Sequence, residues 1–280
     1  MPCQAARADP RSAPSGGGGP LTTLPLPLAA AVSAGVAAIA WYAGTLARSG
    51  VVTAWAIGAV ILYGTGWSGG AVLAAFFVSS NLVSRLLPPT KVPQLDTKGD
   101  RRDGWQVLAN GGPAALAVLV SPDVGLRLWL VTASLAAAAA DTWATAVGGR
   151  SRGPTRLVSS GVVVPPGTSG GVTPAGTIGA VLGAMLVSGV GALTLGRSSL
   201  FAAGTLIGFL GMVLDSFAGS MVQGRFHCLH CNRPSEQRVH QCGQRTELRA
   251  GVGWLSNDGV NLVATTLAVV AGWASWTWLD

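Results

Sequence analysis

Charged residues are scarce in this chain, and the shortage excludes an ordinary water-soluble fold. They make up 10% of its 280 residues, and only 11 residues are acidic, whereas a soluble domain usually carries about 25% charged residues. Hydrophobic residues make up 49% of the chain, and the mean hydropathy is +0.48. Because a lipid-exposed span must satisfy its backbone hydrogen bonds internally, we expect an all-α, polytopic transmembrane helical bundle.

Apolar runs predict about seven or eight spanning helices within one transmembrane domain, residues 23–280. A span needs about 20 predominantly apolar residues, and two of the runs are shorter than this. Small-residue spacing at Gly179-xxx-Gly183 and Gly204-xxx-Gly208 favours close helix packing. The expected spans are 24–47, 51–66, 70–87, 106–121, 126–147, 174–195, 200–222 and 253–278.

The segments between the apolar runs carry most of the charge. Residues 1–22, rich in Pro, Gly, Ser and Arg, predict a disordered tail. The net charge of +7 does not indicate a nucleic-acid-binding protein, because basic residues in such loops set membrane topology. Most fall in three long loops, 88–105, 148–173 and 223–252. By the positive-inside rule these loops are cytoplasmic and both termini lie outside. If residues 51–66 formed a re-entrant segment and not a span, the N-terminus would lie inside, and the three loops would stay cytoplasmic. We expect a prokaryotic plasma membrane, or an organelle membrane in a eukaryote.

Three of the few acidic residues lie in apolar runs. Asp141 and Asp215 lie within such runs, and Asp258 begins another. A carboxylate costs at least about 2.5 kcal/mol at the bilayer centre, so one that is kept there is a functional candidate. Asp141-Thr-Trp-Ala and Asp215-Ser-Phe-Ala also repeat one motif, which predicts an internal duplication with a site between two related halves. One interpretation is that the three hold Mg²⁺. A proton relay, another cation site or interhelical hydrogen bonds are the alternatives.

Basic and amide side chains next to these runs are candidate phosphate-binding groups. Lys98, Arg101 and Arg102 can offset phosphate charge, although a cluster that only sets topology has the same pattern. Asn110 enters an apolar run, where its amide needs polar partners. At the start of the last span, Asn257, Asp258 and Asn261 form a further polar cluster.

The stretch 165–174 is rich in small residues and precedes a span that can begin at Pro174. Its backbone N–H groups can approach an anion closely, and the helix start points its positive end at the same place. The Gly-Lys-Ser/Thr element of a P-loop is missing, and a plain flexible turn is the alternative. The candidate anion-binding residues are Gly167, Thr168, Ser169, Gly170 and Gly171.

Every cysteine except Cys3 lies in the loop 223–252. A Cys-x2-Cys pair and a His-x-Cys pair together have the donor set of a tetrahedral zinc site. Four protein ligands leave no open position, so such a zinc would be structural and would order a loop with little core. Unbound thiols or a redox pair are the alternatives, and His227 or His230 could replace one ligand. The expected ligands are Cys228, Cys231, His240 and Cys242.

Five motifs occur in order along most of the chain. They are Gly-Asp-Arg-Arg-Asp-Gly-Trp-Gln-Val-Leu-Ala-Asn-Gly (99–111), Asp-Thr-Trp-Ala (141–144), Val-Pro-Pro-Gly-Thr-Ser-Gly-Gly-Val-Thr (164–173), Asp-Ser-Phe-Ala-Gly-Ser (215–220) and Asn-Asp-Gly-Val-Asn (257–261). Together they resemble the integral membrane family once catalogued as domain of unknown function 92, which includes transmembrane protein 19. The Cys/His loop resembles the form in prokaryotic members.

The resemblance implies a reaction. The plant chloroplast member of this family is a phytyl-phosphate kinase that favours CTP as donor. The pattern Asp141, Ala144, Gly148 also resembles one in CTP-dependent polyprenol kinases and cytidylyltransferases. The other motifs are closer to the transmembrane protein 19 branch. The resemblance thus implies phosphoryl transfer from CTP or ATP to a prenyl monophosphate.

We therefore expect a membrane-embedded prenyl-phosphate kinase. Its partners would be the bilayer, a prenyl-phosphate lipid and a nucleoside triphosphate with Mg²⁺. The alternative is an ion-coupled transporter, since duplicated units and mid-span carboxylates also suit alternating access. A non-catalytic scaffold with a zinc loop leaves the repeated aspartates unexplained. The depth of the aspartates in the membrane distinguishes the kinase from the transporter, because a kinase site lies near the cytoplasmic surface and a transport site near the midplane.

Overall fold

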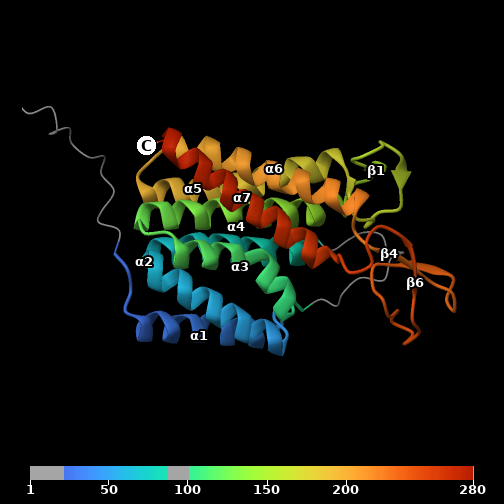
Figure 1. Ribbon diagram of the computed structural model, residues 1–280, viewed down its shortest axis with the longest axis horizontal. Helices are drawn as coiled ribbons and strands as arrows, with labels where there is room; N and C mark the ends of the chain where they lie inside the picture. Colours follow the sequence, from blue (N-terminus) through green and yellow to red (C-terminus); the bar gives the residue numbers. More distant parts are fainter. Residues whose placement is uncertain (1–21, 88–100, 280) are drawn as a thin grey trace, which may run out of the picture.

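The protein is a bundle of long helices with small sheets at one end (Figure 1). The computed structural model describes residues 22–87 and 101–279, and seven helices lie within them. The helices are α1 (Leu26–Tyr42), α2 (Arg48–Leu86), α3 (Gly104–Val120), α4 (Val124–Gly148), α5 (Pro174–Leu195), α6 (Ser199–Met221) and α7 (Asn257–Leu279).

Of these helices α2, α4, α5, α6 and α7 are long and apolar enough to cross a membrane, whereas α1 and α3 have 17 residues each. The expected helical membrane bundle is confirmed, and the number of spans stays a prediction. So does the internal duplication. The predicted tail, apart from Thr22, and Lys98 lie outside the described residues.

The helix α2 folds back on itself at Gly66 (Figure 1). Gly66 has φ 62° and ψ −152°, a conformation that is essentially restricted to glycine. A Cβ built at Gly58 would lie 3.7 Å from the Leu73 side chain, although residues this far apart in a straight helix are separated by about 22 Å. The two arms therefore correspond to the expected spans 51–66 and 70–87.

The central helix is α4, which packs against α2, α3, α5, α6 and α7. Every residue from Leu128 to Ala140 is buried. The neighbouring helices approach closely because they present glycine to it. A Cβ at Gly183 of α5 would lie 2.8 Å from the Ala139 carbonyl oxygen, and one at Gly208 of α6 would lie 2.9 Å from the Ala136 carbonyl carbon. This is the small-residue packing that the glycine spacing predicts.

Two interhelical hydrogen bonds fix α7 against the rest of the bundle. The Trp129 indole N–H of α4 donates to the Gly272 carbonyl at 2.8 Å, and the Thr265 hydroxyl donates to the Ala109 carbonyl of α3 at 2.8 Å. Large apolar side chains such as Ile39 and Leu193 are exposed on the outside of the bundle. These outer surfaces suit lipid, because lipid chains are as apolar as the side chains themselves.

The long connections fold into two small antiparallel sheets that the sequence analysis did not predict (Figure 1). Strands of two to four residues are too short to show a period-2 pattern. The first sheet has the order β2-β1-β3 and the second the order β5-β4-β6. Their strands are β1 (Thr155–Leu157), β2 (Val163–Val164), β3 (Gly171–Val172), β4 (Arg225–Cys228), β5 (Arg233–Ser235) and β6 (Glu247–Ala250).

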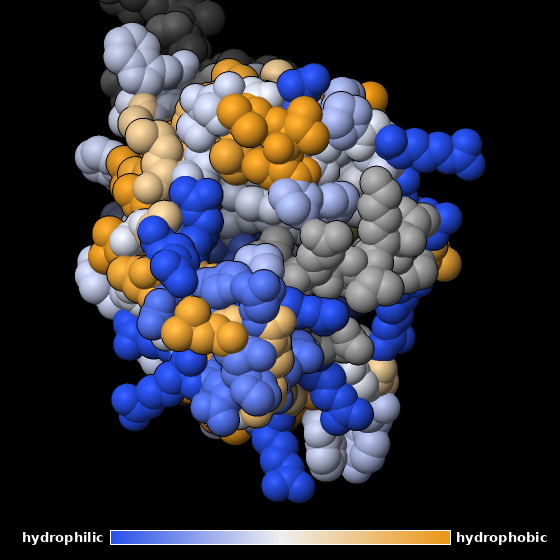
Figure 2. Space-filling view, turned by 90° about the vertical axis from the view of Figure 1, so that its right-hand side faces the viewer, coloured by the Kyte–Doolittle hydropathy of each residue, from blue (hydrophilic) through white to orange (hydrophobic). Residues whose placement is uncertain are grey.

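The two ends of the bundle differ in charge. Among the described residues, every arginine except Arg127 and Arg197 lies at the end that carries the sheets, which we call the loop end. Figure 2 views this end and shows hydrophilic side chains gathered over it. The start of α1 and the end of α7 both lie at the opposite end (Figure 1). That the loop end faces the cytoplasm stays a prediction.

We expect Gly66→Ala to destabilise the protein by about 1–3 kcal/mol or more. A methyl group would strain the backbone at φ 62° and would collide with the Thr22 carbonyl oxygen. The control is Gly35→Ala in α1, where an added Cβ meets no atom within 4 Å. Thermal unfolding of both variants in detergent measures the effect. Equal melting temperatures for the two variants would contradict the fold-back at Gly66.

Candidate functional site

The structure brings Asp141 and Asp215 together near the loop end. Asp141 is half-buried and lies seven residues before the end of α4, while Asp215 is 9% exposed and lies six residues before the end of α6. At 1.5 Å per residue, each lies about 10 Å from its helix end. The two carboxylates are close enough to interact electrostatically. If the hydrocarbon core, about 30 Å thick, ends where these helices end, the two carboxylates lie about a third of the way into it.

Arg102 reaches this pair from the other side of the bundle. Its backbone pairs with the α1–α2 connection, since its N–H donates to the Thr45 carbonyl at 3.0 Å and its carbonyl accepts from Ala47 N–H at 2.9 Å. Its guanidinium lies over the Phe76 ring, 5.9 Å from the centroid, and interacts electrostatically with Asp141. Burial lowers the pKa of Arg102 and Asp141 raises it, and arginine stays charged at any physiological pH. Arg101, its neighbour, is exposed.

Several buried polar atoms in this region have no hydrogen-bond partner. They include Asp215 Oδ1, the Asn261 Oδ1 of α7 and the Trp143 indole nitrogen. Gly211 of α6 lies opposite Ala264 of α7, so Asp215 and Asn261, one turn closer to the loop end, are at the same level. An unsatisfied buried oxygen is costly. Carboxylate and amide oxygens are ligands that hard cations such as Mg²⁺ accept, so Asp141, Asp215 and Asn261 fit this ion.

Asp258 is half-buried in the first turn of α7, next to the exposed Asn257. The three aspartates do not form one cluster. In the part of the chain that the structure describes, the only group of three or more Cys, His, Asp or Glu side chains that could hold an ion consists of cysteines and a histidine. The role of Asp258 as a magnesium ligand stays a prediction. Asp103, which belongs to the 99–111 motif, forms a capping box with Gln106 at the start of α3.

A cavity of about 440 Å³ lies among α1, α2 and α3. Its wall is apolar, with side chains such as Ile57 and Phe77, and only four polar side chains line it. The Ser33 hydroxyl donates to a backbone carbonyl. The other three polar residues belong to the loop end of α3 or just precede it, namely Arg102, Gln106 and Asn110. The cavity therefore suits an amphipathic ligand with an apolar chain and an anionic head.

Residues 165–171, which we call the glycine-rich stretch, pack against the last turns of α6. A Cβ at Gly170, where φ is +75°, would lie 2.5 Å from the Ser216 carbonyl oxygen and would collide with Ser220. The stretch thus lies directly beyond Asp215 at the loop end. The N–H groups of Thr168 and Gly171 donate within it, to the carbonyls of Pro165 and Thr168. The expected helix start at Pro174 is confirmed, with the Thr173 hydroxyl accepting from Gly176 N–H at 3.0 Å.

Two residues that sequence analysis missed hold this stretch. The Ser169 hydroxyl donates to the Glu236 carboxylate, and the Gln223 amide donates to the Ser169 hydroxyl at 2.8 Å. The Ser169 N–H also donates to Glu236. Burial raises the pKa of Glu236, and the bonds from Ser169 oppose that rise. Glu236 could have been singled out from the sequence, because an acidic residue is rare in such a basic loop. That the stretch cradles phosphate stays a prediction, because three of its N–H groups already have partners.

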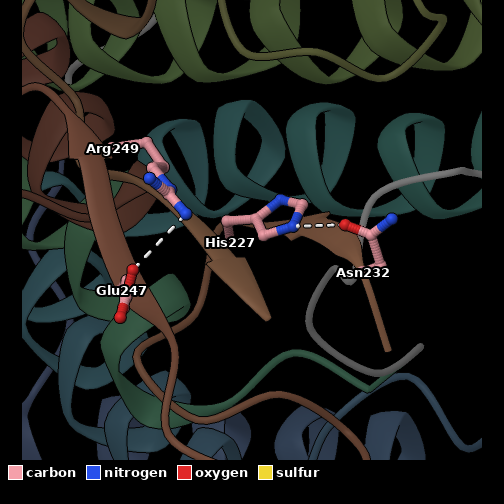
Figure 3. A network of polar contacts seen from close by, with 4 residues as sticks. All are labelled: His227, Asn232, Glu247 and Arg249. Atoms are coloured by element: carbon pink, nitrogen blue, oxygen red, sulfur yellow. Dashed lines mark hydrogen bonds and ion pairs between the residues drawn. The ribbon is translucent and has the colours of Figure 1, made fainter. Parts of the chain in front are cut away.

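The four expected zinc ligands come together in the second sheet and the turn beside it. Their ligand atoms all lie within 4.8 Å of one another, and the Cys228 and Cys242 sulfurs are 3.7 Å apart. The Cys231 N–H donates to the Cys228 sulfur, which lowers the pKa of Cys228. The other histidines do not join this group. His227 contacts Asn232 Oδ1 at 3.0 Å, beside an exposed Glu247–Arg249 ion pair (Figure 3), and His230 is exposed.

We expect Gly170→Ala to loosen the glycine-rich stretch from α6 and Gly167→Ala to leave it in place. Both glycines have positive φ, so alanine costs about 1 kcal/mol of backbone strain in either. Only at Gly170 does the new methyl group collide with Ser220, whereas at Gly167 it meets no atom within 4 Å. Hydrogen exchange of residues 165–171 measures the difference. Equal exchange in the two variants would contradict the packing of this stretch on α6.

Comparisons with known proteins agree with this architecture. The model of the family "Integral membrane protein DUF92" matches residues 31–269. An uncharacterized membrane protein of Methanocaldococcus jannaschii is 30% identical over 229 residues, which cover 81% of this chain and 84% of that protein. No solved structure matches the chain. The match spans the bundle, the aspartates and both sheets, and the chain therefore belongs to the integral membrane protein family DUF92.

Proposed function

We propose that this protein is a membrane-embedded kinase that transfers a phosphoryl group from CTP or ATP to a prenyl monophosphate. One observation carries the proposal: Arg102 lines the apolar cavity and also interacts with Asp141. An apolar chain held in the cavity therefore ends beside a guanidinium and a pair of carboxylates. These are the groups that phosphoryl transfer between two anions requires.

The acceptor lipid would bind along the cavity. Its chain would lie among the apolar side chains of α1, α2 and α3, where each buried methylene contributes about 0.8 kcal/mol. Its phosphate would meet Arg102, which binds phosphate oxygens through two parallel N–H bonds. The amides of Gln106 and Asn110 line the same part of the cavity and would orient the head group.

Phosphoryl transfer needs little covalent chemistry from the protein. An oxygen of the acceptor phosphate forms a bond to the terminal phosphorus of the donor, the bond to the β-phosphate oxygen breaks, and a nucleoside diphosphate leaves. No general base is required, since the acceptor phosphate is already ionised. Asp141 and Asp215, with the Asn261 amide, would hold Mg²⁺, which offsets the charge of the donor phosphates when bound. The protein's contribution is placement and charge.

The depth of the aspartates supports a kinase rather than an ion-coupled transporter. They lie about 10 Å from their helix ends at the loop end, they interact with each other, and Asp141 also interacts with Arg102. A transport site lies near the midplane, on a path that opens to both sides. If the loop end faces the cytoplasm, as its arginines favour, the site lies on the side of the membrane where CTP and ATP are found.

We expect Asp141→Asn to reduce transfer at least about 100-fold, as the loss of one charge-stabilising group does in other enzymes. Detergent-purified protein is incubated with Mg²⁺, labelled CTP or ATP, and prenyl monophosphates of several lengths. Chromatography follows the labelled lipid diphosphate. The control is Asp123→Asn at the far end of α4, where Asp123 caps the helix and asparagine caps equally well. Undiminished transfer by folded Asp141→Asn protein would sink the assignment.

A second prediction concerns the lipid chain. We expect Ala37→Phe, which adds a ring to a buried position of the cavity wall, to raise KM for a long prenyl monophosphate about tenfold, the loss of one to two buried methylenes. KM for the nucleotide should not change. The control is Ala31→Phe, on an exposed face of α1 outside the cavity. Parallel changes in both KM values, or an effect as large at Ala31, would count against this cavity as the lipid site.

A further inference from the structure

The segment between α6 and α7 contains a group of side chains that the proposed kinase does not use. Three thiols and one imidazole meet there, with all ligand atoms within 4.8 Å of one another. The Cys228 and Cys242 sulfurs are 3.7 Å apart. A disulfide needs about 2.05 Å. A tetrahedral zinc with Zn–S bonds of about 2.3 Å separates two sulfur ligands by about 3.8 Å. The spacing therefore matches the edge of a zinc tetrahedron.

Two tight turns bring these ligands together. In the first, β4 and β5 pair at Cys228 and Arg233, and Asn232 takes the left-handed conformation with φ 49°. In the second, Gly243 N–H donates to the His240 carbonyl at 2.8 Å, and Cys242 N–H donates to His240 Nδ1 at 3.2 Å. Each pair of ligands is thus preorganised by its own turn.

The same segment has almost no apolar core. Within 223–252 the buried apolar side chains are those of Phe226 and Cys228. A unit this small rarely stays folded without a disulfide or a metal. Since Cys228, Cys231 and Cys242 are all free thiols, no disulfide joins the two turns, and a metal is the remaining cross-link.

We propose that Cys228, Cys231, His240 and Cys242 bind one zinc ion that folds the 223–252 segment and holds Glu236 against the glycine-rich stretch. Three thiolates and one imidazole are a common structural zinc set, and four protein ligands leave no position for a substrate. The site is therefore structural. Two residues of this segment bond to Ser169, namely Gln223 and Glu236, and one of them lies between the ligands.

That residue is Glu236, which lies in the chain between the two ligand pairs. It accepts hydrogen bonds from the hydroxyl and the N–H of Ser169. Ser169 precedes Gly170, the residue that packs directly on α6. A zinc ion that fixes Cys231 and His240 fixes the chain on both sides of Glu236. The metal site thereby positions the stretch next to the Asp215 helix.

Metal content tests the site directly. The full-length protein, carrying an affinity tag without histidine, is purified in detergent and analysed by elemental mass spectrometry. We expect about one zinc per chain in the wild type and none in the Cys228→Ser/Cys231→Ser variant. His230→Ala, in the same turn but outside the ligand group, should keep its zinc. Zinc retained by the double variant, or iron in place of zinc, would overturn the proposal.

A second measurement covers the case in which the double variant does not fold. A chelator removes the metal from wild-type protein, and cobalt is then added. We expect the strong visible bands of tetrahedral, thiolate-bound cobalt, which zinc should abolish by displacement. Wild-type protein that binds neither zinc nor cobalt contradicts the assignment.

Hydrogen exchange tests the connection to the glycine-rich stretch. Zinc removal should raise exchange in both 223–252 and 165–171. Glu236→Ala should raise exchange in 165–171 alone and keep the zinc, and Glu236→Gln, which still accepts a hydrogen bond, should restore protection. If 165–171 exchanges equally with and without zinc, the connection is wrong. None of these readouts requires kinase activity, so they succeed or fail independently of the proposed function.

Discussion

The close approach of neighbouring helices to α4 is the constraint on which the rest of the structure depends. Without a hydrophobic driving force between helices in lipid, association depends on packing at short range and on interhelical hydrogen bonds. Glycines of α5 and α6 meet the alanine-rich middle of α4 backbone to backbone, as at Gly183 and Ala139. Asp141 comes directly after this run of alanines. The packing that holds the bundle together therefore also sets the depth of the carboxylate.

Interactions among the polar groups near Asp141 offset only part of the free energy that it costs to remove these groups from water. Arg102 and Asp141 attract each other, but Asp141 and Asp215 are like charges in a poorly solvated place. One oxygen of Asp215 has no hydrogen-bond partner. A helical protein that only needed stability would replace such groups with apolar ones, since buried ion pairs rarely add net stability. This uncompensated burial is the reason for proposing that a cation and an anionic ligand bind here.

The connections at the loop end form a polar surface beside the carboxylates, which the apolar helices alone do not provide. Its two sheets are small and poor in apolar side chains, so few contacts within each hold them. They are tied instead to one another and to the bundle, through Glu236 with Ser169 and through Gly170 with the end of α6. Under the proposed zinc site, a change in the Cys/His segment would act on the glycine-rich stretch through Glu236.

The sequence by itself determined the class of the protein and most of its helices. Hydropathy is a local property, so the expected span 174–195 coincides with α5, and others differ by a few residues. The isolated aspartates and the spacing of Cys228 and Cys231 are also readable in one dimension. The tertiary structure alone decided which of these residues meet: Arg102 with Asp141, Asp141 with Asp215, Glu236 with Ser169, and three helices around one cavity. Such contacts join residues tens of positions apart, and only the packing of helices and loops in three dimensions brings them together.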